Sequence, residues 1–302
     1  MSNDFRSGFI AVLGRPNVGK STLVNSLIGR KISIISPKPQ TTRNQIKGIY
    51  TTESEQIIFI DTPGIHKPRH QLGEFMNREA FATLSDADLI LYIIDGTAAY
   101  GSGEQFVIER LKKTDVPVIL TVNKIDLIKD KNRLLENIVR FTKAYEFSEV
   151  YYVSALRGDN LEKLRMALVK RMPNGPKYYP GDTYSDRPES FIIAEIIREK
   201  ALTLTKEEVP HSLAVVTESI GPAADNPHLL EIRATVYVER PSQKKIIIGA
   251  GGKMLKQIGT AARKEIVMLF GQKIYLDLWV KVESDWRNKK RELRRLGYFL
   301  EN

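Results

Sequence analysis

Residues 14–21, with the sequence GRPNVGKS, constrain the fold of this chain more than any other segment. A short apolar run at residues 9–13 precedes them, and residues 21–28 follow with apolar side chains at helical spacing. A strand, a glycine-rich loop and a helix in this order form a cradle for a polyphosphate, because the loop backbone can close its N–H groups around the phosphates. The lysine then reaches the outer phosphates, and the serine hydroxyl ligates Mg2+. We therefore predict a phosphate-binding loop.

The first half of the chain alternates apolar runs of strand length with helical segments. The runs lie at residues 57–60, 89–94, 118–122 and 150–153, and residues 46–50 could add an edge strand. This alternation predicts an α/β fold, a P-loop domain whose mainly parallel sheet is covered on both faces.

The order of elements changes in the second half. Residues 172–188 are rich in proline and glycine and lose the apolar periodicity, so we predict a first domain at 1–172, a linker at 173–188 and a second domain at 189–302. The second domain is expected to be α+β. Its expected elements are helices at 190–205, 243–248 and 253–270, strands at 213–217, 232–238 and 273–282, and a basic helical segment at 285–296.

The composition limits the chemistry and the partners. The 302 residues include no cysteine, which excludes disulfides, thiolate zinc sites and thiol catalysis. Because we find neither a secretory signal nor an apolar run of membrane-spanning length, we expect a cytoplasmic protein. The net charge is +10, and residues 240–302 carry 15 basic against 6 acidic side chains. This basic end favours nucleic acid or an anionic membrane surface as a partner, with a solvated charged face as the alternative.

Further motifs directly follow the predicted strands. The carboxyl ends of parallel strands meet at one sheet edge, where open α/β sheets bind their ligands. Asp61 and Gly64, in the string DTPG, come directly after the run at 57–60. The Asp61 carboxylate can hold Mg2+ through a water molecule, and the Gly64 N–H can meet a γ-phosphate.

Asn123, Lys124 and Asp126 follow the run at 118–122 and indicate a guanine base. The Asp126 carboxylate can accept hydrogen bonds from the N1–H and the exocyclic amine of guanine, which adenine does not offer. Asn123 can brace the phosphate loop, and the Lys124 stem can lie over the purine. Ala155, after Ser154, can donate its N–H to the guanine carbonyl. Together the motifs predict a GTPase domain and disfavour ATP.

A switch loop lies between the first two motifs. Thr42 is the predicted residue that ligates Mg2+ and meets the γ-phosphate, with Thr41 as the runner-up. The predicted catalytic residues are Lys20, Thr42, Gly64 and Asn17, and the predicted metal ligands are Ser21, Thr42 and, through water, Asp61. The predicted nucleotide-binding residues are Gly14, Arg15, Pro16, Asn17, Val18, Gly19, Lys20, Ser21, Thr22, Asp61, Thr62, Pro63, Gly64, Asn123, Lys124, Asp126, Ser154 and Ala155.

The strings GRPNVGKS, QTTRN, DTPGI, NKID and VSA, in this order, resemble the motifs of the bacterial Era GTPases. In the second half, residues 208–212, the segment IIIGAGG, the strand LWVKV and residues 296–298 resemble the type II KH domain of that family. The resemblance covers about the full length. It implies a cytoplasmic GTPase that binds the 3′ end region of small-subunit ribosomal RNA and acts in 30S subunit assembly. Separately, we expect a monomer, and the motif residues predict Mg2+ as the cofactor.

Ile65 stands where a Ras-like enzyme carries a glutamine that orients water. An apolar side chain cannot orient water by hydrogen bonding, so we expect slow intrinsic hydrolysis that RNA or the ribosome accelerates. Asn17 offers a substitute, because GTPases with the PNVGKS pattern are similar to those that bind K+ near the phosphates. Asn17 as an ordinary loop residue is the alternative.

Residues 249–252, with the sequence GAGG, lie between two predicted helices. We interpret them as the G-x-x-G loop of a KH domain, which lets an RNA backbone approach closely, with a plain helix–helix turn as the alternative. Ile246, Ile247, Ile248 and Leu255 are the expected apolar walls. Ala250 is uncharged, which shifts the expected phosphate contacts to Lys253 and its neighbours. The predicted RNA-binding residues are Lys244, Lys245, Ile248, Gly249, Ala250, Gly251, Gly252, Lys253, Lys256 and Arg263.

Several alternatives stay open. A second basic cluster at residues 287–295 is an RNA contact, a solvated helix face or a weak peripheral contact with the inner face of the cell membrane. Trp279 and Trp286 are interpreted as packing or surface residues rather than base stackers. Two other functions compete with an RNA-binding switch: an RNA-binding protein with structural GTP, and a membrane-associated signalling GTPase.

Overall fold

The computed structural model describes residues 5–205 and 209–299, without the side chains of Pro210 and His211. The chain divides into two compact units. The first comprises Met1–Ser33, Thr42–Arg69 and Gly73–Asp186, and the second comprises Ile34–Thr41, His70–Leu72 and Arg187–Asn302. The final division, after Asp186, lies within the proline-rich stretch, and the domain boundaries proposed from composition stay a prediction.

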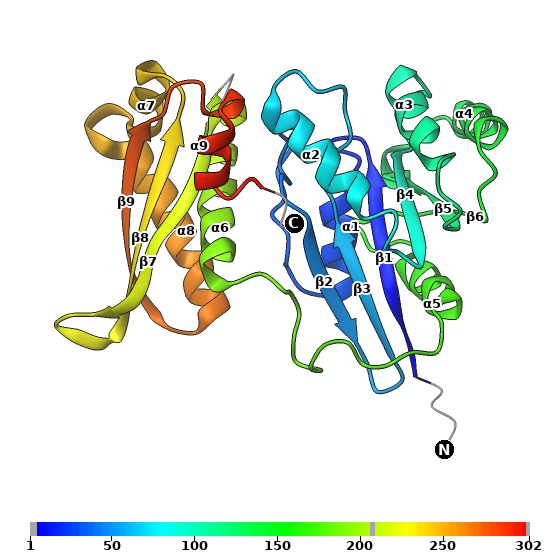
Figure 1. Ribbon diagram of the computed structural model, residues 1–302, viewed down its shortest axis with the longest axis horizontal. Coiled ribbons are helices and arrows are strands. Elements are labelled where there is room, and N and C mark those ends of the chain that lie inside the picture. Colours follow the sequence, from blue (N-terminus) through cyan, green and yellow to red (C-terminus); the bar gives the residue numbers. More distant parts are fainter. Residues whose placement is uncertain (1–4, 206–208, 300–302) are drawn as a thin grey trace. The chain divides into compact units, whose positions relative to one another are not determined.

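The first unit is built on a six-stranded sheet in the order β2-β3-β1-β4-β5-β6 (Figure 1). Only β2 runs antiparallel to its neighbour, and the other pairs are parallel. The expected P-loop fold with a mainly parallel sheet is therefore confirmed, as is the edge strand. The strands are β1 (Arg6–Gly14), β2 (Ile46–Thr51), β3 (Glu55–Asp61), β4 (Leu89–Asp95), β5 (Val118–Asn123) and β6 (Glu149–Tyr152).

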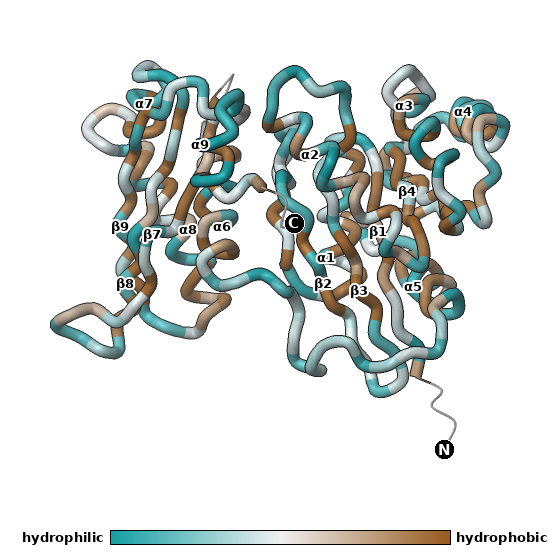
Figure 2. Tube along the Cα trace, in the orientation of Figure 1, coloured by the Kyte–Doolittle hydropathy of each residue, from teal (hydrophilic) through white to brown (hydrophobic). Residues whose placement is uncertain are grey.

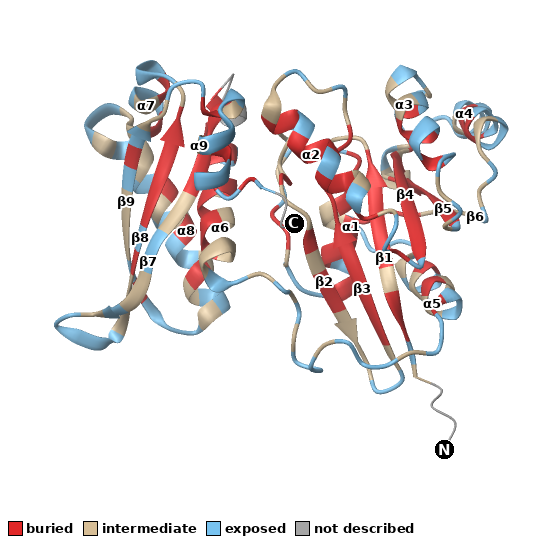
Figure 3. Ribbon diagram, in the orientation of Figure 1, coloured by how far each residue is buried: buried red, intermediate tan, exposed pale blue. Residues whose placement is uncertain are grey.

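Helices cover the two faces of this sheet and bury one apolar cluster on each side. Alternate residues of β1 divide between the clusters, because Ile10 and Val12 pack into one while Ala11 and Leu13 pack into the other. Strands β1, β3 and β4 are apolar in Figure 2 and mostly buried in Figure 3. The helices are α1 (Lys20–Ile28), α2 (Gln71–Ala82), α3 (Ser102–Leu111), η1 (Ile125–Leu127), α4 (Lys131–Ala144) and α5 (Leu161–Arg171).

The second unit has a three-stranded sheet in the order β7-β8-β9, in which β7 is antiparallel and β9 parallel to β8. Helices α6 and α8 pack on one face of the sheet around a single apolar cluster. The elements are α6 (Glu189–Leu204), η2 (Val209–Ser212), β7 (Ala214–Ala223), β8 (Asn226–Val238), α7 (Pro241–Ile248), η3 (Ala250–Gly252), α8 (Lys253–Phe270), β9 (Lys273–Val282), η4 (Trp286–Asn288) and α9 (Lys290–Arg295).

The sequence-based bounds of α8 and β9 are confirmed, and the expected helical character of residues 285–296 is found over most of the segment. It is divided into two short helices, η4 and α9, because Lys289 between them has an extended backbone. Trp286 explains the break. Its ring is fully buried, its indole N–H donates to the Ser212 carbonyl, and it stacks on Tyr298, so this turn is held against the unit. The interpretation of Trp286 as a packing residue is confirmed.

Candidate nucleotide site and nucleic-acid interface

The phosphate loop joins β1 to α1 and requires glycine at both of its ends. Gly14 has φ 154°, and a Cβ there would lie 2.3 Å from the Ile93 carbonyl oxygen. Gly19 has φ 96°, and its Cβ would lie 2.3 Å from the Asn123 amide nitrogen. A side chain at either position would push the loop off its neighbours, so the sequence pattern reflects close backbone approach.

Lys20 is buried at the first position of α1 and curls back onto the loop. Its Nζ donates to the carbonyls of Gly14, at 3.3 Å, and Arg15, at 3.0 Å. Burial lowers the pKa of Lys20 to about 8, against the opposing attraction of Asp61 and Glu104. A bound phosphate would place an anion beside this buried lysine, so the loop geometry is suited to binding phosphate.

Asp61, Ser21 and Thr42 form a group of oxygens suited to a hard cation. The Ser21 and Thr42 hydroxyls are 2.8 Å apart, and Asp61 at the end of β3 is fully buried. Within the described part of the chain, neither Asp61 oxygen makes a hydrogen bond of good geometry. Burial raises the pKa of this carboxyl, and the Ser21 hydroxyl, Lys20 and Ser33 only partly offset that effect. A divalent cation would satisfy the buried carboxylate, so these residues fit Mg2+.

The loop after β3 closes against the phosphate loop. The Ile65 N–H donates to the Gly14 carbonyl at 3.0 Å, and a Cβ on Gly64 would lie 2.7 Å from the Pro16 backbone. The Thr62 hydroxyl donates to the Val12 carbonyl at 2.6 Å, so this side chain stabilises the backbone of β1. The Ile65 side chain is only 1% exposed and packs in the core, where it can contact no attacking water.

Asn123 ties the predicted base loop to the phosphate loop. Its amide N–H donates to the Val18 carbonyl at 2.8 Å, and its amide oxygen accepts from the Ala155 N–H at 2.9 Å. The Ser154 hydroxyl donates to Asp126 Oδ1 at 2.6 Å. The structure thus brings the predicted loops of Asn123, Asp126 and Ala155 together at one sheet edge.

Sequence reasoning missed Asp95, Glu104 and Arg157. Lys124 Nζ lies 2.7 Å from Asp95 Oδ2 and also donates to the Asn17 carbonyl at 2.7 Å. Although burial opposes the shift, the hydrogen bonds from Lys124 and Thr97 lower the pKa of Asp95. Asp95 ends β4, so the rule that identified Asp61 could have found it.

Glu104 and Arg157 had no local sequence signal. Burial raises the pKa of Glu104, which accepts from the Tyr92 hydroxyl and lies 3.8 Å from Arg15 of the phosphate loop. Arg157 Nε lies 3.7 Å from Asp126 Oδ2. Each of these two residues lies on a different segment from the motif residue that it contacts. Only the folded structure brings them together.

The two candidate switch threonines differ in what they contact. The Thr42 hydroxyl meets Ser21, whereas the Thr41 hydroxyl donates to the Lys38 carbonyl at 2.6 Å. Within the second unit, the Thr41 carbonyl accepts from Arg198 of α6, and the Ile35 N–H donates to Glu199 at 2.9 Å. The segment before Thr42 is therefore bonded to α6.

The GAGG loop in the second unit forms a sharp connection between α7 and α8. Gly249, Gly251 and Gly252 all have positive φ, at 72°, 57° and 78°. A Cβ on Gly249 would lie 2.7 Å from Met254, whereas Gly251 and Gly252 have open space around them. Lys253 and Lys256 are exposed on the first turns of α8. This is a bare backbone surface flanked by cations, as RNA phosphates require.

The predicted groove walls separate into two groups. Ile247 is fully buried in the core, so its assignment as a wall is wrong: three consecutive residues of a helix cannot all face the same way. Ile246 is 43% exposed, and Ile248 and Leu255 are half-buried. Lys245 and Arg263 are exposed and Lys244 is half-buried, while Glu208 lies outside the described residues.

The basic cluster at residues 287–295 also contains two kinds of side chain, those held in ion pairs and those exposed to solvent. Arg287 is paired with Glu239 at 2.5 Å, and Arg295 with Glu283 at 2.9 Å, so these two guanidinium groups are structural. Lys290, Arg291 and Arg294 are exposed. Across the described residues, none of the helices combines the length and apolar character that a membrane crossing needs.

Comparison with known proteins gives matches for both units. The family described as 50S ribosome-binding GTPase matches residues 9–124, and the KH domain family matches residues 208–287. A structure of Era with MgGDPNP and nucleotides 1506–1542 of 16S ribosomal RNA is 42% identical, with a TM-score of 0.95, covering 98% of this chain and 100% of that one. A point variant of Aquifex aeolicus Era bound to GDP and AlF4− is also 42% identical, with a TM-score of 0.94 and the same coverage.

Proposed function

Because the chain belongs to the Era family of GTPases, we propose that it is a GTP-hydrolysing switch that binds the 3′ end region of small-subunit ribosomal RNA and acts in 30S assembly. One observation carries the proposal. The phosphate loop, the Thr42 and Asp61 loops and the guanine-type loop of Asp126 meet at one sheet edge of a chain that also has a GAGG loop between helices.

The proposed hydrolysis uses positioning and charge. The loop N–H groups orient the phosphates, Lys20 neutralises charge between the β- and γ-phosphates, and the Gly64 N–H meets the γ-phosphate. Mg2+, held by Ser21 and Thr42 and through water by Asp61, supplies further positive charge when bound. The Asp126 carboxylate selects guanine, with Ser154 fixing its orientation.

The attacking water needs an orienting group from elsewhere, since Ile65 lies in the core. We propose that RNA accelerates hydrolysis and that K+ near Asn17 supplies additional charge. A single-turnover assay of phosphate release, with and without a 3′-end ribosomal RNA fragment, tests the first point. Faster release with RNA supports regulation, while an unchanged rate supports the alternative in which GTP is structural. Equal rates in Na+ and K+ would remove the K+ proposal.

Coupling between nucleotide and RNA would pass through the backbone at Thr41 and Thr42. The Thr42 hydroxyl contacts Ser21 in the first unit, and the preceding carbonyl is bonded to Arg198 in the second. A γ-phosphate that repositions Thr42 pulls on a segment already bonded to α6, so nucleotide state can bias the RNA-binding unit.

Crosslinking to cellular RNA, with GTP or GDP bound, tests the proposed partner. We expect enrichment of small-subunit ribosomal RNA, stronger in one nucleotide state. Failure to enrich it in either state would refute the function. We propose a monomeric cytoplasmic protein with weak peripheral membrane contact through the basic α9 at most, which co-sedimentation with anionic liposomes at physiological salt checks.

A further inference from the structure

The outer face of the second sheet carries two exposed aromatic rings along β9, whereas Thr235 and Tyr237 of β8 on the same face are buried. Ile274 and Val280 of β9 are buried in the core, so the alternate residues Tyr275 and Trp279 point to the opposite face. Tyr275 is 55% exposed and Trp279 61%. The GAGG loop joins α7 to α8, whereas these rings lie on the reverse side of the sheet from the core that α8 packs against.

Along β9, two lysines of this face are exposed and make no ion pair among the described residues. Asp277, between the two rings, accepts from the Trp279 indole N–H at 2.9 Å, which also holds that ring in place. Across the strand pair, Glu231 is paired with Arg233 at 2.7 Å. These two acidic groups are therefore engaged, and Glu218 accepts from the Tyr237 hydroxyl at 3.3 Å, whereas Lys273 and Lys281 are exposed with no ion pair among the described residues.

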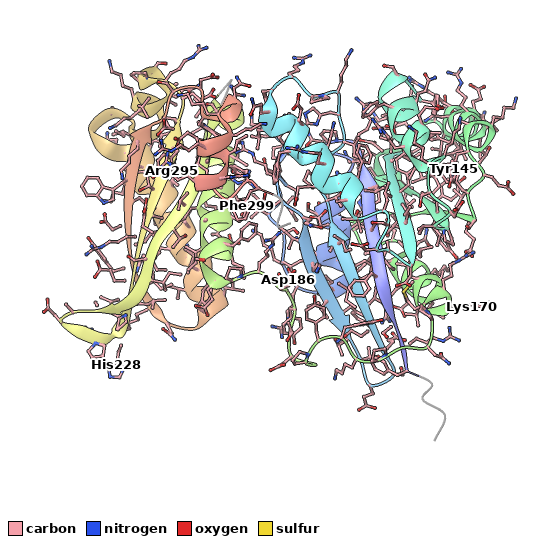
Figure 4. The ribbon with its side chains drawn as sticks, viewed as in Figure 1. Tyr145, Lys170, Asp186, His228, Arg295 and Phe299 are labelled. Atoms are coloured by element: carbon pink, nitrogen blue, oxygen red, sulfur yellow. The ribbon has the colours of Figure 1, made fainter. Side chains whose placement is uncertain are left out.

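One end of the face continues into a basic helix. Arg295 of α9, labelled in Figure 4, lies over the Tyr237 ring at 4.8 Å and donates to its hydroxyl at 3.2 Å. Tyr237 pairs with Lys281 in the sheet, so α9 adjoins the Lys281 end of this face, where Arg295 pairs with Glu283. Arg291 and Arg294 of that helix are exposed. Aromatic rings flanked by cations form the platform on which single-stranded nucleic acid stacks its bases.

We propose that this face is a second RNA-binding surface, on which Trp279 and Tyr275 stack bases of a single strand and Lys273 and Lys281 contact its phosphates. The two rings stand four residues apart, about 13 Å along the strand, so they would engage non-adjacent bases of an extended segment. The proposal rests on the proposed RNA-binding function and adds a surface outside the G-x-x-G groove. Trp279 then acts as a base stacker rather than the simple surface residue that its sequence suggested.

The test compares two lengths of the ribosomal 3′-end RNA on the full chain: about four nucleotides, which a KH groove clamps, and about twelve, which can also reach the platform. Trp279→Ala should weaken binding of the long RNA at least about fivefold, the lower limit for one lost stacking contact, and leave the short RNA unchanged. Tyr178→Ala, which removes a 47% exposed tyrosine of the first unit, should leave both affinities unchanged.

Fluorescence supplies a second readout, because the chain has only two tryptophans and Trp286 is fully buried. The long RNA should quench the wild-type emission. Trp279→Phe should retain the affinity, since phenylalanine still stacks, but lose the quenching. Wild-type affinity for the long RNA in Trp279→Ala, or quenching that persists in Trp279→Phe, would overturn the proposal.

A third variant separates this proposal from the function it rests on. Gly251 has open space around it, and aspartate tolerates its positive φ of 57° better than most residues do, so Gly251→Asp would place an anion in the G-x-x-G loop and should weaken binding of both RNAs. If the wild type binds neither RNA, the proposed function fails. If Gly251→Asp loses both RNAs and Trp279→Ala behaves as wild type, only the second surface is refuted.

Discussion

Nucleotide binding should become coupled to proton uptake as the pH rises from 7 to 8.5. Burial lowers the pKa of Lys20 to about 8, so this side chain carries its proton in most molecules at pH 7 and in a minority at pH 8.5. A bound phosphate favours the charged lysine and raises its pKa again. Binding must therefore take up a proton wherever the free protein has lost one.

The magnitude follows from that pKa. The deprotonated fraction of Lys20 is about 0.1 at pH 7 and about 0.75 at pH 8.5, so uptake should rise from about 0.1 to about 0.75 proton per nucleotide. The dissociation constant should increase about fourfold over the same interval. Isothermal titration calorimetry with GDP, in pairs of buffers that differ in ionisation enthalpy, measures both quantities.

The sign of the proton exchange identifies the group. Asp61, whose pKa burial raises, can only release a proton when a cation binds, so net uptake at pH 8.5 must come from a base such as Lys20. Proton uptake that stays near zero from pH 7 to 8.5, with an unchanged dissociation constant, would refute the argument that phosphate binding raises the pKa of the buried lysine.

Three further outcomes are expected. Asp126→Asn should lower affinity for GTP and favour xanthine nucleotides, because an amide can donate to the extra carbonyl of xanthine; unchanged guanine selectivity in a competition assay would contradict this. Asn123→Ala should destabilise the first unit by about 3 kcal/mol, since it breaks two buried hydrogen bonds, and lower its melting temperature by about 6–12 °C in calorimetry. The exposed Asn132→Ala is its control, and equal shifts would refute the bracing role. Lys253→Ala should reduce the slope of log affinity for RNA against log salt by about one; an unchanged slope would exclude a phosphate contact.

The sequence predicted the first sheet well because the signals there are local. A buried parallel strand reads as an apolar run, and a motif residue at its end lies at the ligand edge by topology, as Asp61 and Asn123 do. The same rule would have reached Asp95. Arg157 was not predictable in this way, because its proximity to Asp126 depends on how separate loops fold over the sheet.

The second unit was predicted less accurately, because packing rather than local sequence decides some of its features. The helix α8 and the strand β9 have clear periodicity, so their bounds were correct. The basic segment at residues 285–296 is rich in Lys, Arg and Leu, which favour helix, yet burial of Trp286 against Tyr298 interrupts it. Ile247 and Ile246 look alike in sequence, and only the packing of α7 decides that one is core and the other exposed.

The bonds of Asn123 limit how this protein can diversify. One side chain fastens the turn that grips phosphate and the turn that reads the base, through Val18 and Ala155. A lineage that altered base preference by replacing this asparagine would loosen its hold on every nucleotide at once. Changes of base preference are therefore more accessible at Asp126, which takes no part in that brace, than at Asn123, where a replacement would also loosen the phosphate loop.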